Sequence, residues 1–246
     1  MGAALFNSTM RGSFAHSIKH LGMRVIARAL AGRRLVSDAT GLANIPSDGA
    51  LVLAARHYHH LFDGVALYQT VPREIHILVT LDWAPNQTTR FLMESAIRLA
   101  GWPLVLRRAA LAFKPDGSRA QTKTVFKEND VACYQRRALR QAVDLLMGGA
   151  ALLIFPEGFP NIDPNFTPKT KPDEFLPFSA GFAVIAAAAE KRLGTAVPVV
   201  PVGLNYTAGA QWCARINFGT SLYARDFATR RDFVQEVENA VIRLSR

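Results

Sequence analysis

Residues 56–64, Arg-His-Tyr-His-His-Leu-Phe-Asp-Gly, concentrate groups that can move protons, and they directly follow an apolar strand predicted over Ala50–Ala55. Loops at strand ends are where α/β folds place their functional groups. A histidine beside an aspartate is the minimal general-base pair, because the carboxylate orients the imidazole while the second ring nitrogen takes a proton. We therefore expect Asp63 to pair with a histidine of the cluster at 57, 59 and 60. The candidates for the general base are His57 and His59.

The three neighbouring histidines could instead bind a metal ion, or merely cap a helix or fill a polar pocket. All six histidines of the chain lie in its first third, whereas a two-metal hydrolase needs further histidine ligands downstream. Cys133 and Cys213 are the only cysteines, and their separation fits neither a zinc site nor a disulfide framework. We expect no metal and no cofactor.

A second candidate constellation is Phe155-Pro156-Glu157-Gly158, which follows an apolar strand predicted over residues 150–155. A glutamate between proline and glycine at a strand end is poorly placed for packing in the core. It is well placed to reach into a cleft, where its carboxylate would bind substrate hydroxyls or support a neighbouring loop. These four residues are therefore candidate substrate-binding residues.

Arg107 and Arg108 form a third constellation, after Gly101-Trp102 and a short predicted strand. Arginines at a strand end can hold a phosphate through two parallel hydrogen bonds, although an exposed basic pair is the plainer interpretation. The sequence contains no Gly-x-Ser-x-Gly, no Walker loop and no Gly-x-Gly-x-x-Gly. These absences disfavour a serine hydrolase, an NTPase and a dinucleotide enzyme.

Strands that alternate with helices after residue 40 predict an α/β fold, a mixed and largely parallel sheet flanked by helices. The strand predicted over Val197–Leu204 contains Pro198 and Pro201, which predicts an edge strand or a bulge, bordering a groove. We expect residues 1–36 to be an N-terminal basic amphipathic helical segment and residues 37–246 to be the main domain.

The N-terminal segment carries six basic residues and no acidic one, within a chain of formal net charge +10. Such charge favours anionic partners, and without a nucleic-acid-binding signature we expect no nucleic acid. On a helical wheel, Phe14, Ile18, Leu21, Val25, Ile26 and Leu30 lie opposite His16, Ser17, His20, Arg24 and Arg28. This helix would either lie in a lipid interface or pack on the core. No membrane-spanning run or secretory signal is found, so we expect a cytoplasmic protein that is at most peripheral to a membrane.

Read in order, these pieces resemble the glycerol-3-phosphate and lysophosphatidate acyltransferase superfamily, the PlsC-like enzymes. The resemblance covers about residues 40–225 and rests on the order of several short motifs. In chain order, these motifs are a strand followed by His57…Asp63, Gly101…Arg107-Arg108, Phe155–Gly158, Phe178–Gly181, Val197-Pro-Val-Val-Pro-Val-Gly203 and Ile216–Gly219. The chain departs from the family pattern in three places. Five residues separate His57 from Asp63 where the family has four, Arg56 replaces an asparagine, and Phe159-Pro160-Asn161 replaces Thr-Arg-Ser.

The resemblance implies that residues 37–246 form an acyltransferase catalytic domain. It would move a fatty acyl group from acyl-CoA or an acyl carrier protein to the hydroxyl of a glycerol-phosphate or lysophospholipid acceptor. The resemblance also implies a cytoplasmic enzyme in peripheral contact with the anionic inner face of the membrane. A histidine oriented by Asp63 would act as the general base, with a one-residue insertion letting His57 reach Asp63. Arg107 or Arg108 would bind the acceptor phosphate, with Lys169 and Lys171 as alternatives. The alternatives are a thioesterase or esterase with the same His-Asp pair, and a non-catalytic basic membrane-binding module.

Overall fold

A curled sheet of six strands forms the centre of the protein, in the order β1-β8-β7-β2-β6-β3, and β4 and β5 form a separate pair. These relations come from a computed structural model that describes residues 22–111, 124–164 and 166–246. All neighbouring strands run parallel except β7 and β8, which confirms the predicted mixed, largely parallel sheet. The strands are β1 (Leu35–Thr40), β2 (Leu51–Ala55), β3 (Ile75–Ile77), β4 (Val79–Thr80), β5 (Leu104–Val105), β6 (Ala151–Ile154), β7 (Val199–Thr207) and β8 (Trp212–Phe218).

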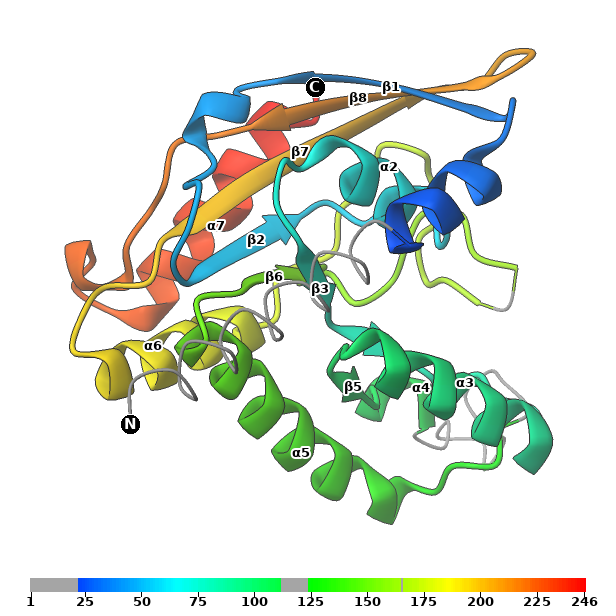
Figure 1. Cartoon of the computed structure of the whole chain (residues 1–246), viewed down its shortest axis with the longest axis horizontal. Coiled ribbons are helices and arrows are strands. Elements are labelled where there is room, and N and C mark those ends of the chain that lie inside the picture. The colour runs from blue at the N-terminus through cyan, green and yellow to red at the C-terminus, as the bar shows by residue number, and fades with distance from the viewer. Residues whose placement is uncertain (1–21, 112–123, 165) are drawn as a thin grey trace, which may run out of the picture.

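Helices cover both faces of this sheet (Figure 1). One face packs against α2 and helical residues 22–31, and the other packs against α5, α6 and α7. A smaller apolar cluster joins α3, β5, α4 and the start of α5. The helices are α2 (Phe62–Thr70), α3 (Gln87–Ala100), α4 (Arg108–Leu111), α5 (Glu128–Met147), α6 (Gly181–Leu193) and α7 (Arg230–Leu244).

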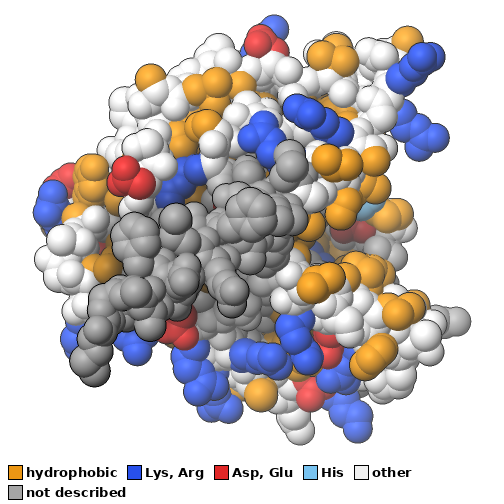
Figure 2. Space-filling model, viewed as in Figure 1, with side chains coloured by type: hydrophobic (Ala, Val, Ile, Leu, Met, Phe, Trp, Pro, Cys, Tyr) orange, Lys and Arg blue, Asp and Glu red, His pale blue; other side chains and the backbone are white. Residues whose placement is uncertain are grey.

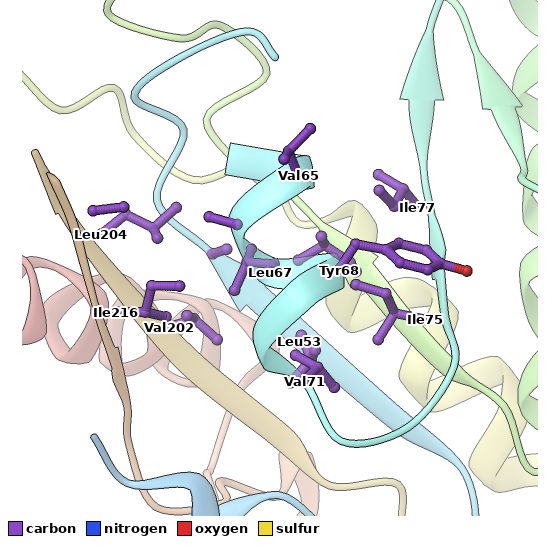
Figure 3. Packing of buried hydrophobic residues seen from close by; sticks show 14 of the residues in the cluster. Leu53, Val65, Leu67, Tyr68, Val71, Ile75, Ile77, Val202, Leu204 and Ile216 are labelled. Carbon is purple, nitrogen blue, oxygen red and sulfur yellow. The ribbon is translucent and has the colours of Figure 1, made fainter. Parts of the chain in front are cut away.

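Strand β2 is buried on both faces, as its uninterrupted apolar sequence predicts for a central parallel strand. Side chains alternate along a strand, so Leu53 points to the cluster that contains α2 whereas Val52 and Ala54 point to the opposite cluster. Figure 3 shows Leu67 and Tyr68 of α2 packed among the side chains of the first cluster. This packing fixes the loop between β2 and α2, which carries the histidines.

Of the two arrangements that the prolines predicted, the edge strand is wrong, because β7 lies between β8 and β2. The pairing of β7 with β8 begins only at Val202, opposite Phe218. Pro201 lies one residue before this ladder, where its carbonyl still accepts a hydrogen bond from Gly219 N–H. A proline at that point removes only one hydrogen bond, at the end of the ladder, so an interior strand tolerates it.

The N-terminal segment is described from residue 22 onward, and residues 22–31 are helical. The predicted helix positions Phe14, His16, Ser17, Ile18, His20 and Leu21 lie outside the described residues. The boundary predicted at residue 36 falls inside β1, which pairs with β8 over its whole length. Strand β1 therefore joins the N-terminal segment to the central sheet.

Candidate active site

The loop between β2 and α2 folds around the carboxylate of Asp63, which is fully buried in the first turn of α2. Its oxygens accept hydrogen bonds from the backbone N–H groups of Tyr58, at 2.7 Å, and His59, at 3.0 Å. An ionised carboxylate can only accept hydrogen bonds, so these donors fix the orientation of the Asp63 side chain. The loop therefore presents a rigid anion to whatever side chain approaches it.

His57 is the side chain that meets this anion, with 2.9 Å between His57 Nδ1 and Asp63 Oδ2. The predicted contact is therefore present despite the extra residue between the two positions. Because Asp63 accepts, Nδ1 of the neutral ring carries the proton and Nε2 keeps a lone pair. The ring stacks on Phe155 with centroids 4.4 Å apart and lines a cavity. This geometry leaves Nε2 available to take a proton from a ligand.

His59 is placed differently, since its Nδ1 accepts hydrogen bonds from the backbone N–H groups of Leu61 and Phe62, both at 3.2 Å. Burial, helped by the neighbouring His60, lowers the pKa of His59 and keeps the ring neutral. His59 thus caps the start of α2 and does not line the cavity. His60 lines the cavity, but its Nδ1 lies 3.3 Å from the carbonyl of Ile162.

Glu157 does not fit its predicted role in substrate binding, because protein donors occupy both of its carboxylate oxygens. Oε1 accepts from the backbone N–H of His57 at 2.8 Å, and Oε2 accepts from the backbone N–H of Leu176 at 3.0 Å. Only 5% of the residue is exposed. Glu157 instead holds the His57 backbone against the loop that follows β6, which is the supporting role that the sequence also allowed.

Lys169 completes this connection, with its ammonium group 2.5 Å from Glu157 Oε2. The same group donates to the carbonyl of His57 at 2.9 Å and to Oδ1 of Asn161 at 3.1 Å. Both charged side chains are fully buried. Burial lowers the pKa of Lys169, and the adjacent Glu157 carboxylate offsets part of that shift. The pair therefore clamps the His57 backbone from two sides.

Arg107 and Arg108 occupy different environments. Arg107 forms two hydrogen bonds to the buried carboxylate of Asp82, both 2.7 Å long, and donates to the carbonyl of Gly158 at 2.5 Å. Its guanidinium has five N–H groups, so two remain for a ligand, and the side chain lines the cavity. Arg108 is exposed on α4 and does not line the cavity. The predicted arginine clamp thus reduces to Arg107.

The remaining residues of the predicted Phe-Pro-Glu-Gly constellation divide between the cavity and the core. Phe155 and Gly158 line the cavity, whereas Pro156 is buried and does not. Gly158 has a φ of 75°, a left-handed conformation that disfavours any other residue. This turn directs its carbonyl to Arg107. Phe155 and Gly158 therefore remain candidates for substrate contact, and Pro156 shapes the strand end.

An apolar cavity of about 620 Å³ adjoins His57 and Arg107. That size lies within the range of small-molecule sites, which are mostly apolar with a few convergent polar groups. Helical residues 22–31, α2, α3 and the segment after β6 all contribute to its wall. Its apolar lining includes Ile26, Leu30, Val65, Trp83, Met93 and Trp102. The site therefore combines a proton acceptor, His57, and a cation, Arg107, with a large apolar cavity.

The part of the chain that the structure describes contains no group of three or more His, Cys, Asp or Glu side chains that could hold a metal ion. None of its described helices is both long and apolar enough to cross a bilayer.

Comparison with known proteins decides the family. The family model described as "Acyltransferase" matches residues 37–205, which is more than half of the chain. The chain belongs to the acyltransferase family. All the histidine, acidic and basic side chains of the site described above fall within the matched range, whereas the cavity wall also uses helical residues 22–31, which precede it. Family membership also favours an enzyme over the non-catalytic membrane-binding module.

A solved structure supports the fold of this acyltransferase. The 1-acyl-sn-glycerophosphate acyltransferase PlsC from Thermotoga maritima matches with a TM-score of 0.58 and 19% sequence identity. The match covers 98% of this chain and 86% of that chain. No curated protein sequence matches the chain.

Three positions that the sequence did not assign correctly help to position the site. Asp82 directly follows the largely apolar run of residues 75–81, and an acidic residue at the end of such a run was a usable signal. Lys169 was considered only as a phosphate ligand. Arg56, noted only as a departure from the family, is buried and donates to the carbonyls of Leu204 at 3.1 Å and Pro172 at 2.9 Å. It thereby ties the segment after β6 to β7.

Proposed function

We propose that this acyltransferase moves a fatty acyl group from a thioester, acyl-CoA or an acyl carrier protein, to a hydroxyl of a glycerol-phosphate or lysophospholipid acceptor. The observation that carries the proposal is the 2.9 Å contact between His57 and Asp63 on the wall of the apolar cavity. The structural likeness to a lysophosphatidate acyltransferase supports the acceptor class.

In the proposed reaction, His57 Nε2 takes the proton of the acceptor hydroxyl while the hydroxyl oxygen attacks the thioester carbonyl. The tetrahedral intermediate collapses with loss of the thiolate, which recovers the proton from His57. Asp63 stabilises the imidazolium in between, since a buried carboxylate favours the protonated ring. The apolar cavity would hold the acyl chain, whose burial contributes about 0.8 kcal/mol per methylene.

The direct test is incubation of the full chain with a long-chain acyl-CoA or acyl carrier protein and a panel of acceptors. The panel contains glycerol 3-phosphate, lysophosphatidate and a neutral lyso-lipid, and products are resolved by mass. We expect acylated phosphate-bearing product and free thiol in equal amounts. Free fatty acid that no acceptor suppresses would contradict the proposal and favour the thioesterase alternative.

Arg107 is the proposed contact for the acceptor phosphate, and replacing it by lysine should raise the KM for a phosphate-bearing acceptor about tenfold. Lysine keeps the charge but loses the paired N–H groups, and one charge-assisted hydrogen bond is worth about 1.5 kcal/mol or more. The KM for a neutral acceptor should change little. Arg108→Lys, the adjacent exposed position, is the matched control and should leave both KM values unchanged.

Steady-state kinetics with both acceptors, alongside thermal unfolding to show that the variant folds, give the measurement. An equal rise in KM for charged and neutral acceptors would mean that Arg107 only maintains the cavity wall through Asp82.

A further inference from the structure

Polar groups at the surface of the protein need no partner within the chain, because water satisfies their hydrogen bonds. Figure 2 shows lysine and arginine side chains standing out from one face of the molecule in this way. A polar atom in the core has no such supply, and nearly all buried polar atoms of folded proteins are paired. An unpaired one beside a functional site therefore needs an explanation.

Two buried side-chain atoms beside the loop between β2 and α2 have no hydrogen-bond partner in the part of the chain that the structure describes. They are Nε of Arg56 and the hydroxyl of Tyr206. The Arg56 guanidinium donates to two carbonyls through its other nitrogens. Tyr206 has a single polar side-chain atom, and only 8% of the residue is exposed. Of the two side chains, Tyr206 is thus the one whose whole hydrogen-bonding capacity is unused.

Strand β7 directs Tyr206 toward the beginning of α2. Val202, Leu204 and Tyr206 are spaced two residues apart and belong to the same buried cluster as α2, so they share one face of the strand. In Figure 3, Val202 and Leu204 lie on the side of α2, and Leu204 is nearer to the end of the helix that carries Val65. Tyr206, two residues further along β7, therefore reaches the first turn of α2, where Asp63 lies.

Aromatic contacts agree with this position. The Tyr206 ring stacks on Tyr58 with centroids 4.9 Å apart and meets the edge of Trp212 at 6.1 Å. Trp212 in turn contacts the ring of His59 at 5.9 Å. Tyr58 and His59 are the residues whose backbone N–H groups bind the Asp63 carboxylate. Tyr206 thus packs against the part of the loop that wraps this carboxylate.

The two oxygens of the Asp63 carboxylate are held unequally by the described residues. Oδ2 accepts from His57 Nδ1 and from the backbone N–H of Tyr58. Oδ1 accepts only a share of the His59 N–H, whose nitrogen lies 3.0 Å from both oxygens. A carboxylate oxygen can accept two hydrogen bonds, and the terminal torsion of aspartate is soft. A further donor on Oδ1 would therefore find a free acceptor site and would fix the rotation of the carboxylate.

The phenol of Tyr206 is a donor suited to that site. Burial raises the pKa of Tyr206 well above its usual value, and the adjacent Asp63 carboxylate raises it further. The hydroxyl therefore keeps its proton and can donate it. An unused donor and an unused acceptor site lie side by side. Catalytic hydrogen bonds are often long or poorly aligned in structures without substrate, so the absence of ideal geometry does not exclude this pair.

We infer that Tyr206 is a positioning residue, whose hydroxyl donates to Asp63 Oδ1 and thereby holds Oδ2 in line with His57. The inference rests on the proposed general-base role of His57. A fixed carboxylate keeps the imidazole oriented with Nε2 toward the acceptor hydroxyl, whereas a rotating one weakens the bond to Nδ1. Tyr206 lies one residue beyond the range that the family model matches, so the match does not assign it a role.

Tyr206→Phe tests the inference, because it removes the oxygen atom and keeps the ring. We expect kcat to fall about tenfold, the equivalent of one charge-assisted hydrogen bond, with the KM of both substrates unchanged. The midpoint of thermal unfolding should stay within about 4 °C of the wild-type value. Tyr134→Phe is the matched control, since the Tyr134 hydroxyl donates to Glu94 Oε1 at 2.6 Å on α3, and it should keep the wild-type kcat.

A proton NMR signal provides a second measurement that needs no activity. The signal is that of the His57 Nδ1–H, identified by its loss in His57→Gln. In the wild-type chain we expect it far downfield, as a hydrogen bond to a carboxylate requires. In Tyr206→Phe it should move upfield and exchange faster with water, because the carboxylate is no longer fixed. Tyr134→Phe should leave the signal in place.

An unchanged Nδ1–H signal in folded Tyr206→Phe would overturn the inference, whatever the kcat. A shifted signal with an unchanged kcat would also overturn it, since the bond would then have no effect on catalysis. So would a Tyr206→Phe chain that does not fold, because the hydroxyl would then be a structural group. A wild-type chain that transfers no acyl group, beside a signal that shifts in Tyr206→Phe, would sink the proposed reaction and leave the contact between Tyr206 and Asp63 intact.

Discussion

Replacing Lys169 by methionine should lower the free energy of unfolding by about 3–5 kcal/mol, because it leaves the buried carboxylate of Glu157 without its cation. The substitution also removes the donor to the carbonyl of His57. We expect a fall in kcat on the order of 100-fold, since small displacements of a catalytic group have costs of that size, and little change in KM. Urea unfolding and steady-state kinetics measure the two effects.

A second substitution distinguishes the lost charge pair from a loss of packing. The double variant Lys169→Met/Glu157→Gln removes both charges, so it should regain part of the stability that Lys169→Met loses. Lys171→Met, two residues away and exposed, is the control and should be near the wild type. If the loss of stability in the double variant equalled or exceeded the sum of the losses in Lys169→Met and Glu157→Gln, the two charges would not act as a pair.

The contacts of Glu157 with Lys169 and His57 could not be predicted from the sequence. A glutamate between proline and glycine suggested a group that reaches into a cleft. The Glu157 carboxylate instead binds Lys169, 12 residues after it, and the backbone N–H of His57, 100 residues before it. Those partners follow from the parallel register of β2 and β6 and from the path of the long loop. Neither can be derived from local spacing, so the sequence singled out Glu157 but could not choose between its two candidate roles.

Contacts within one loop were more accessible from sequence. His57 and Asp63 are six positions apart, and a strand followed directly by a helix leaves few ways to arrange the residues between them. The sequence could not choose between His57 and His59, because the choice depends on how the backbone wraps the carboxylate. His59 Nδ1 turns toward the N–H groups that begin α2, which leaves His57 as the partner of Asp63.

The fold divides in the same way. The uninterrupted apolar run of β2 predicts a strand buried on both faces, as observed. Strands β1 and β8 were not predicted, since each mixes polar or charged residues, such as Asp38 and Arg215, with apolar ones. They are fixed by pairing with each other and, for β8, with β7. Strands at or next to a sheet edge depend on tertiary partners more than on their own composition.

His57→Ala should lower kcat by about 100- to 10,000-fold while the chain stays folded, because general-base catalysis contributes that much and the ring is not a core residue. Two of its neighbours serve as controls. His59→Ala should cost about 0.5–2 kcal/mol of stability through loss of the cap at α2, yet keep most of the activity. His60→Ala should change kcat little, although His60 also lines the cavity.

Asp63→Asn provides the complementary test of the pair. Asparagine keeps the size of the side chain but cannot stabilise a protonated ring, so kcat should fall while acceptor KM stays close to the wild-type value. The carboxylate also orders the backbone around it, and thermal unfolding must therefore accompany the kinetics. An active, folded His57→Ala variant beside an inactive, folded His59→Ala variant would reverse the assignment. His59, which caps α2, would then be the general base, and the loop between β2 and α2 would have to rearrange when substrate binds.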